Sequence, residues 1–239
     1  MMTIKEVQLV MNMATTNRVI SIEGNIGSGK TTLLTHLEKV FEKDPGVVFL
    51  REPVNEWESI KDEDGASMIQ KFYADQEKYS FPFQMMAYIS RLALLKDAMK
   101  KHPEAIIITE RSLYTDKFVF AKMLHIMKKI EDVNYQIYTK WFDTFAQECP
   151  IHGCVYVKAD PDICCERIVK RSRTGEDSIP LDYLTSCHDY HEAMLLEILP
   201  MFKRSTEDVV VLDGNVDVYS CPEELDNWIQ KITNLMQET

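Results

Sequence analysis

One segment has the pattern of a phosphate-binding loop: a glycine, four further residues and then Gly-Lys-Thr, at residues 24–31. An apolar run typical of a buried strand precedes it, and apolar residues at helical spacing follow it. Glycines let backbone N–H groups converge on phosphate oxygens, and the N-terminus of the following helix favours negative charge. In such loops the lysine contacts the terminal phosphates and the threonine hydroxyl faces Mg²⁺. We therefore expect a nucleoside triphosphate to bind here. The residues expected to hold it are Gly24, Asn25, Ile26, Gly27, Ser28, Gly29, Lys30, Thr31 and Thr32.

Length and charge limit the class of protein. A chain of 239 residues is long enough for one α/β domain with a substantial core, and no apolar run has the length of a membrane span. The formal net charge of −11 disfavours nucleic acid and anionic membranes as partners, so a site for phosphates must gather its basic residues locally. Residues 1–17 lack the features of a secretory or mitochondrial signal. We expect them to form a flexible tail before a domain at 18–239, in a cytoplasmic protein.

The cysteines agree with a reducing compartment. The chain has six, with no CxxC pair, which favours reduced thiols. Cys187, His188 and His191 lie close together in the sequence, but no second pair at ligand spacing accompanies them. We therefore assign these three residues to core packing or helix surface rather than to a zinc site.

Strand-like and helix-like segments alternate along the chain, as they do when helices flank a parallel sheet. Five continuously apolar runs predict strands covered on both faces, at 19–22, 47–50, 105–108, 154–157 and 209–212. Helices are predicted at about 81–101 and 116–148, with a further pair within 161–203. The fold class expected is α/β: three layers, with a five-stranded parallel sheet between flanking helices.

Charged residues follow two of the predicted strands. Arg51 and Glu52 come after the second strand, and Glu110 and Arg111 after the third. Ligands of open parallel sheets collect at these carboxyl ends. Phosphoryl transfer needs a group that orients and deprotonates the attacking hydroxyl, a bound Mg²⁺ and cations near the transferred phosphoryl group. Glu52 and Glu110 compete for the first two roles, while Arg111 suits the third or holds the base.

The predicted helix at 81–101 carries a polar stripe. Gln84, Ala87 and Arg91 are at i, i+3 and i+7 and share one face. A glutamine amide both donates and accepts hydrogen bonds, which suits the edge of a nucleobase. Four aromatic residues could enclose such a base: Trp57, Tyr73, Phe83 and Phe120.

A basic cluster lies near the end of the first helix in the 161–203 region. Its members are Arg167, Lys170, Arg171 and Arg173, and a loop at 174–178 follows. An arginine-bearing lid that closes over a triphosphate would exclude water and neutralise developing charge.

Together these motifs resemble the deoxynucleoside kinase family, specifically its deoxycytidine and deoxyguanosine kinase branch, from about residue 18 to the C-terminal region. The segments that carry the resemblance are 22–26, 52–54 with Trp57, 80–84, 110–116, 167–173 and 179–184. The resemblance implies a three-layer P-loop kinase fold with a helical lid. It implies transfer of the γ-phosphate of ATP, or another nucleoside triphosphate, to the 5′-hydroxyl of a deoxyribonucleoside with Mg²⁺. It also implies a homodimer formed through long helices within 81–148.

The resemblance assigns roles to residues around the reacting groups. Glu52 takes the proton from the 5′-hydroxyl with support from Arg111, and Lys30 contacts the phosphates. Glu110 organises Mg²⁺ with Thr31, directly or through water, although some enzymes of this kind are described with the base role at this carboxylate.

Other residues are assigned to the two ligands. Tyr73 and Glu176 hold the sugar 3′-hydroxyl, and the donor adenine rests near Asp217 and Val218. The family often has an aromatic residue in place of Val218, so the resemblance does not fix the donor. The residues that read the base are Gln84, Arg91 and Asp116, which favour purines or cytosine over thymine.

Two other functions stay open. A thymidylate-type nucleoside monophosphate kinase also has a phosphate loop and an Arg-Glu-Pro segment, but an Asp-Arg-Tyr sequence is usual where this chain has Glu110-Arg111-Ser112. A non-catalytic nucleotide-binding subunit on the same fold has no need of Lys30, Glu52 or Arg111.

Overall fold

The predicted sheet is present. The structure, a computed structural model, describes residues 17–171, 179–198 and 209–238. Five parallel strands form one sheet in the order β2-β3-β1-β4-β5. The strands are β1 (Arg18–Glu23), β2 (Val47–Leu50), β3 (Ile106–Glu110), β4 (Gly153–Lys158) and β5 (Val209–Asp213). Each predicted strand overlaps one of these, so the α/β class is confirmed.

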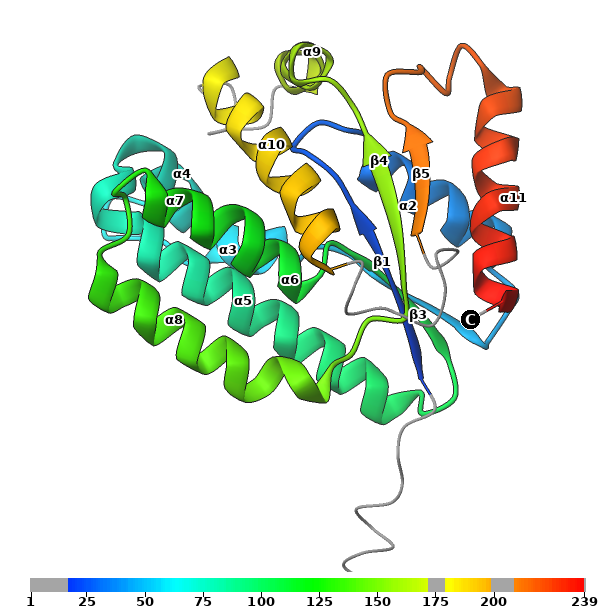
Figure 1. Cartoon of the computed structure of the whole chain (residues 1–239), viewed down its shortest axis with the longest axis horizontal. Coiled ribbons are helices and arrows are strands. Elements are labelled where there is room, and N and C mark those ends of the chain that lie inside the picture. The colour runs from blue at the N-terminus through cyan, green and yellow to red at the C-terminus, as the bar shows by residue number, and fades with distance from the viewer. Residues whose placement is uncertain (1–16, 172–178, 199–208, 239) are drawn as a thin grey trace, which may run out of the picture.

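Helices cover both faces of the sheet (Figure 1). Val19 of β1 packs in a cluster with side chains of α5 (Gln76–Lys101) and α8 (Asp132–Phe145). The next residue, Ile20, packs in a second cluster with α2 (Lys30–Val40) and α11 (Pro222–Glu238). Successive strand residues point to opposite faces, which produces three layers. The prediction of full burial holds for β1, β3 and β4 but not for the sheet edges, because β2 is half-buried and Val211 of β5 is 55% exposed.

The remaining helices connect these layers. They are α3 (Val54–Ser59), α4 (Met68–Ala74), α6 (Leu113–Thr115), the π-helical segment η1 (Asp116–Ala121), α7 (Lys122–Ile126), the 3₁₀ segment η2 (Ala146–Glu148), α9 (Pro161–Arg171) and α10 (Leu181–Ile198). The helix pair predicted within 161–203 corresponds to α9 and α10, with residues 172–178 and 199–203 outside the described part of the chain.

The prediction of one helix at 116–148 is wrong. Residues 127–131 interrupt it, and Lys128 has a left-handed φ of 60°. The backbone N–H groups of Lys129 and Ile130 both donate to the carbonyl of Leu124, which closes α7. The chain then reverses, so that α8 packs on α5.

The start of the helix predicted at about 81 also differs. α5 begins at Gln76, where the carboxylate of Asp75 accepts a hydrogen bond of 3.1 Å from the backbone N–H of Lys78. Pro82 therefore lies inside the helix rather than near its start. No helix in the described ranges is long and apolar enough to span a bilayer.

All five strands are parallel, so their carboxyl ends share one edge of the sheet. The helices α9 and α10 lie at this edge (Figure 1). The phosphate loop and Glu52 follow β1 and β2 at this edge, and Glu110 is the last residue of β3.

Candidate active site

The phosphate loop lies between β1 and α2, and at two of its glycines a side chain would clash with the backbone. Gly24 and Gly27 have positive φ angles of 143° and 81°. A Cβ atom on Gly24 would lie 2.5 Å from the carbonyl oxygen of Val157, and one on Gly27 would lie 2.6 Å from that of Cys164. The loop is therefore held tightly against β4 and α9.

Lys30 and Thr31 open α2 at the end of this loop. Lys30 is buried, and its Nζ donates to the carbonyl of Asn25 at 2.6 Å. Burial, helped by the charge of Arg111 and opposed by nearby carboxylates, lowers the pKa of Lys30 to about 7. The hydroxyl of Thr31 donates to Glu110 Oε1 at 2.5 Å. One hydroxyl and one carboxylate oxygen therefore meet beside the lysine.

Glu52, after β2, is held by two arginines. Its Oε1 lies 3.0 Å from Arg91 Nη2 and 3.1 Å from Arg111 Nε. Burial raises the pKa of Glu52, but the two arginines and Lys30 outweigh burial and lower it to about 2. Glu52 is thus ionised at neutral pH. Its neighbour Arg51 is exposed and pairs instead with Glu38 of α2.

Arg111 adopts an uncommon backbone conformation. Its φ is 65°, a region that non-glycine residues rarely adopt. The hydroxyl of Thr109 donates to the carbonyl of Arg111 at 2.9 Å and holds this turn. The buried guanidinium donates from Nη1 to the carbonyl of Gly24 at 2.7 Å, while its Nε faces Glu52. Arg111 therefore links the phosphate loop to the carboxylate. Strained residues held in this way cluster at functional sites.

A second arginine joins Glu52 to the deep end of the site. Arg91 of α5 is 4% exposed and donates from Nε to Asp116 Oδ2 at 3.0 Å and from Nη1 to the carbonyl of Glu110 at 2.8 Å. Asp116 belongs to the π-helical segment, a rare geometry that recurs at functional sites. Burial raises the pKa of Asp116 to about 6 against the opposing charge of Arg91.

Aromatic side chains enclose the space beside this pair. Trp57 is fixed by a 2.9 Å hydrogen bond from its Nε1 to the hydroxyl of Ser90, and it packs edge-on against Phe83 with ring centroids 5.7 Å apart. Phe83 stacks on Phe72 at 4.5 Å. Phe72 also lines the cavity, although the sequence analysis did not identify it. Gln84 is buried nearby, and its Oε1 has no hydrogen-bond partner among the described residues.

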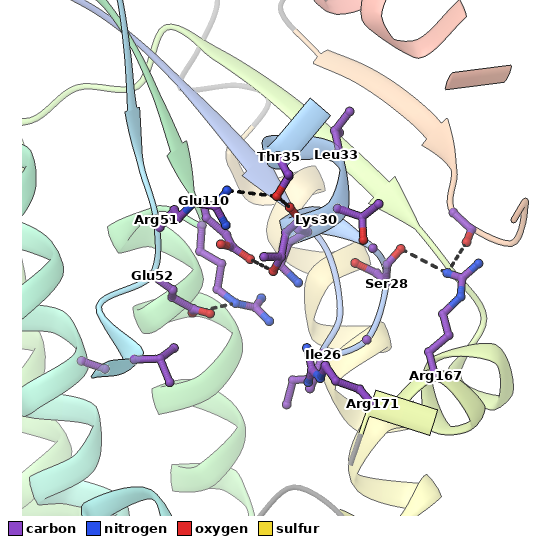
Figure 2. A pocket seen from close by; sticks show the side chains of 18 of the residues that line it. Ile26, Ser28, Lys30, Leu33, Thr35, Arg51, Glu52, Glu110, Arg167 and Arg171 are labelled. Carbon is purple, nitrogen blue, oxygen red and sulfur yellow. Dashed lines mark hydrogen bonds and ion pairs between the residues drawn. The ribbon is translucent and has the colours of Figure 1, made fainter. Parts of the chain in front are cut away.

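These groups share one cavity of about 880 Å³. Figure 2 shows Glu52 and Glu110 on one side of Lys30, with Arg167 on the other side. The predicted residues that line it are Ile26, Gly27, Ser28, Gly29, Lys30, Thr31, Thr32, Glu52, Trp57, Tyr73, Phe83, Gln84, Ala87, Arg91, Glu110, Arg111, Asp116, Phe120, Arg167, Arg171, Asp217 and Val218. Gly24 and Asn25 do not line it, and Asn25 Nδ2 instead donates to the carbonyl of Leu184 at 2.8 Å. Arg173 and Glu176 lie outside the described residues.

The far end of the cavity lies between the phosphate loop and the segment after β5. Arg167 Nη1 donates to the carbonyl of Gly214 at 2.6 Å and to that of Ser28 at 3.3 Å, so α9 is tied to both. Tyr219 also lines this end and is 75% exposed, with its ring 6.3 Å from that of His36. The sequence analysis identified neither ring.

The cavity carries the basic charge that the chain as a whole lacks. The whole chain has a formal net charge of −11, yet many basic residues line this cavity. They are Lys30, Lys39, Arg51, Arg91, Arg111, Arg167, Lys170 and Arg171. Such a local concentration attracts phosphates despite the repulsion of the global field.

A phosphate loop at the carboxyl edge of a parallel sheet, with a basic cavity and a carboxylate between two arginines, defines a P-loop phosphotransferase. The family model for deoxynucleoside kinases matches residues 20–237. The chain belongs to the deoxynucleoside kinase family, and it is an ATP-dependent phosphotransferase that acts on deoxynucleosides.

Three relatives illustrate the similarity. A probable deoxycytidine kinase of fowlpox virus is 37% identical over 185 residues, which cover 76% of this chain and 73% of the viral protein. Human deoxycytidine kinase is 36% identical over 197 residues, with coverage of 74% and 75%. The mitochondrial deoxyguanosine kinase of Xenopus laevis is 30% identical over 194 residues, with coverage of 74% and 72%.

Proposed function

We propose that this kinase phosphorylates the 5′-hydroxyl of deoxycytidine and purine deoxynucleosides, and thymidine poorly, as a step of nucleotide salvage. The observation that carries the proposal is Glu52, an ionised carboxylate between Arg91 and Arg111 in the cavity that also holds Lys30. Relatives named deoxycytidine kinase and deoxyguanosine kinase support the choice of substrates.

Glu52 orients the 5′-hydroxyl and accepts its proton. A carboxylate with a pKa of about 2 is a weak base, but it is ionised at neutral pH. Phosphoryl transfer has a loose transition state in which positioning and electrostatic stabilisation dominate, so a fixed acceptor is sufficient until the proton leaves. Arg111 neutralises charge on the transferred group while it holds Glu52 in place.

Thr31 and Glu110 suit a magnesium ion. Hydroxyl and carboxylate oxygens are the ligands that Mg²⁺ prefers, and these two already converge at 2.5 Å. Mg²⁺ typically takes only one or two protein ligands and completes its shell with water and phosphate oxygens. When bound, the ion would neutralise charge on the donor phosphates. This arrangement gives Glu110 the metal role and leaves the proton to Glu52.

Gln84, Arg91 and Asp116 read the base, and Ala87 leaves room for a purine's second ring. Gln84 Oε1 has no partner among the described residues and is free to accept from a base, for example from the exocyclic amine of cytosine or adenine. Rotation of the amide also suits other base edges, so Arg91 and Asp116 discriminate. Trp57, Phe83 and Phe120 enclose the ring.

The sugar and the donor occupy the rest of the cavity. Tyr73 and Glu176 hold the 3′-hydroxyl, and the donor base rests near Asp217 and Val218. The arginines of the lid, Arg167, Arg171 and Arg173, contact the donor phosphates.

A coupled kinase assay on a panel of nucleosides and nucleoside monophosphates tests this function. Phosphorylation of deoxycytidine, deoxyguanosine or deoxyadenosine supports the proposal. Preferential phosphorylation of thymidylate would instead identify a monophosphate kinase, and nucleotide binding with no transfer to any acceptor would identify a non-catalytic subunit.

Lys30 should take up a proton when ATP binds at pH 8. Its pKa of about 7 in the free enzyme means that it is mostly neutral at that pH, whereas triphosphate oxygens beside it raise the pKa and favour the ammonium form. Titration calorimetry in two buffers with different ionisation enthalpies should give an uptake of about one proton per ATP. Lys30→Arg, which stays charged, should show none. Equal uptake by both proteins would contradict this assignment.

A homodimer is part of the proposal. The apolar residues Val133, Ile137 and Trp141 of α8 lie at i, i+4 and i+8, so they form a stripe, and they are 64%, 40% and 47% exposed. A second copy that covers this stripe would remove apolar surface from water.

If the dimer forms through this stripe, a charged substitution within it should make the protein monomeric. Ile137→Glu should shift the protein from dimer to monomer in size-exclusion chromatography with light scattering, because a buried unpaired carboxylate opposes association. Val40→Glu on α2, another exposed apolar position, is the matched control and should leave the dimer intact. A dimer of unchanged stability in Ile137→Glu would place the interface elsewhere.

We also place the enzyme in the cytoplasm. All six cysteines are unpaired, as expected of a reducing compartment.

A further inference from the structure

α10 carries one polar residue on its fully buried face. Cys187, His191 and Met194 lie at i, i+4 and i+7 of this helix and are 0%, 0% and 1% exposed. The imidazole of His191 lies between aromatic rings, with Phe120 edge-on at 6.2 Å and Tyr156 stacked at 6.4 Å. Burying an imidazole in such surroundings is unfavourable unless both of its nitrogens have partners.

Both nitrogens have partners, and these partners fix the tautomer. Nδ1 lies 2.6 Å from the carbonyl oxygen of Cys187, and Nε2 lies 3.3 Å from Nη1 of Arg111. A carbonyl only accepts and a guanidinium only donates, so Nδ1 carries the proton and Nε2 accepts. Burial, together with the charge of Arg111, lowers the pKa of His191 well below its ordinary value, which keeps it a neutral acceptor.

His191 contacts the edge of the Arg111 guanidinium that faces away from Glu52. Arg111 Nη1 is shared between His191 and the carbonyl of Gly24, while Nε of the same group meets Glu52. A planar guanidinium held at one edge has its other edge fixed as well. The ring of Phe120, 5.0 Å from Arg111 Cζ, limits movement out of this plane.

We propose that His191 is a positioning residue for phosphoryl transfer: it holds the Arg111 guanidinium so that Nε faces Glu52 while Nη1 binds the phosphate loop. The inference rests on the role proposed above for Arg111. His191 itself touches no reacting group, so its effect on the reaction passes through the arginine.

Asparagine and glutamine substitutions separate positioning from packing. In His191→Gln the amide oxygen can occupy the place of Nε2 and accept from Arg111, whereas in His191→Asn the amide reaches only the place of Nδ1 and the carbonyl of Cys187. We expect His191→Asn to lower kcat by about 10- to 100-fold with little change in KM for deoxycytidine, since misplacing a catalytic group slows chemistry more than binding. His191→Gln should retain most of the wild-type kcat.

Thermal unfolding and a double-mutant cycle complete the test. If kcat follows the melting temperature rather than the presence of an acceptor at the Nε2 position, the role of His191 is packing alone and the inference is wrong. In an Arg111→Lys background, adding His191→Asn should lower kcat little further, because the arrangement that it supports is already lost. Fully additive losses would overturn the inference even if both His191 variants are destabilised. An Arg111→Lys enzyme with wild-type kcat would instead refute the proposed role of Arg111.

Discussion

Replacing Glu52 with glutamine should lower kcat by about 10²–10⁴-fold and leave the affinity for deoxycytidine nearly unchanged. Glutamine has the shape of glutamate and can still accept hydrogen bonds from Arg91 and Arg111, so the pocket keeps its form. It cannot take a proton from the 5′-hydroxyl. The loss therefore falls on the transfer step, and single-turnover kinetics with saturating ATP should locate it there.

Two further substitutions make this result decisive. Glu56→Gln, on the exposed side of α3, changes the net charge by the same amount and should leave kcat unaltered. Glu110→Gln should raise the Mg²⁺ concentration needed for half-maximal rate, because it removes the carboxylate beside Thr31. If Glu110→Gln loses proton transfer while Glu52→Gln stays active, the two carboxylates have the opposite roles.

The sequence alone left these two carboxylates unresolved, and the reason is physical. Each lies at or just beyond the carboxyl end of a strand, and both line the same cavity, so the sequence pattern around each is alike. What distinguishes them is contact between distant segments: Glu110 meets Thr31 of α2, whereas Glu52 meets Arg91 of α5 and Arg111 after β3. Pairings of this kind depend on the order of strands in the sheet, which hydrophobic periodicity does not encode.

The features that the sequence predicted well are those set by short segments. The phosphate loop follows from its own glycines, and the five strands follow from continuous apolar runs. The stripe of Gln84, Ala87 and Arg91 needs only helical spacing, and all three residues are buried and line the cavity.

The errors lie where tertiary packing or capping decides the outcome. The break at 127–131 depends on Lys128 in a left-handed conformation. Glycine is the usual residue in that conformation, and the segment contains none, so the sequence did not indicate a break. The helix α4 was not predicted, although Ser67 and Gln70 form a capping box at its start that is readable in the sequence. α4 carries both Tyr73, which the sequence analysis placed at the pocket, and Phe72, which also lines the cavity and was missed.

Replacing Arg91 with methionine and Asp116 with alanine together should raise kcat/KM for thymidine relative to deoxycytidine by about 10- to 200-fold. The buried pair fills the deep end of the pocket, where the C5-methyl of thymine needs space, and its removal leaves apolar room. Both residues must change at once. Asp116 alone would be a buried charge without its partner, which is costly. Arg91 alone would still fill the deep end of the pocket through its pair with Glu52.

We expect the same double substitution to slow the reaction itself. Arg91 is one of the two cations on Glu52, so kcat should fall for every substrate and only the ratio between substrates reports on specificity. The matched control is Lys129→Met with Glu77→Ala, which removes an ion pair of 3.0 Å on the surface and should leave the ratio unchanged. A wild-type enzyme that prefers thymidine to deoxycytidine and to purine deoxynucleosides would refute this reading of the pocket. So would a double variant whose ratio matches that of the control, because the methyl group of thymine would then meet some other part of the wall.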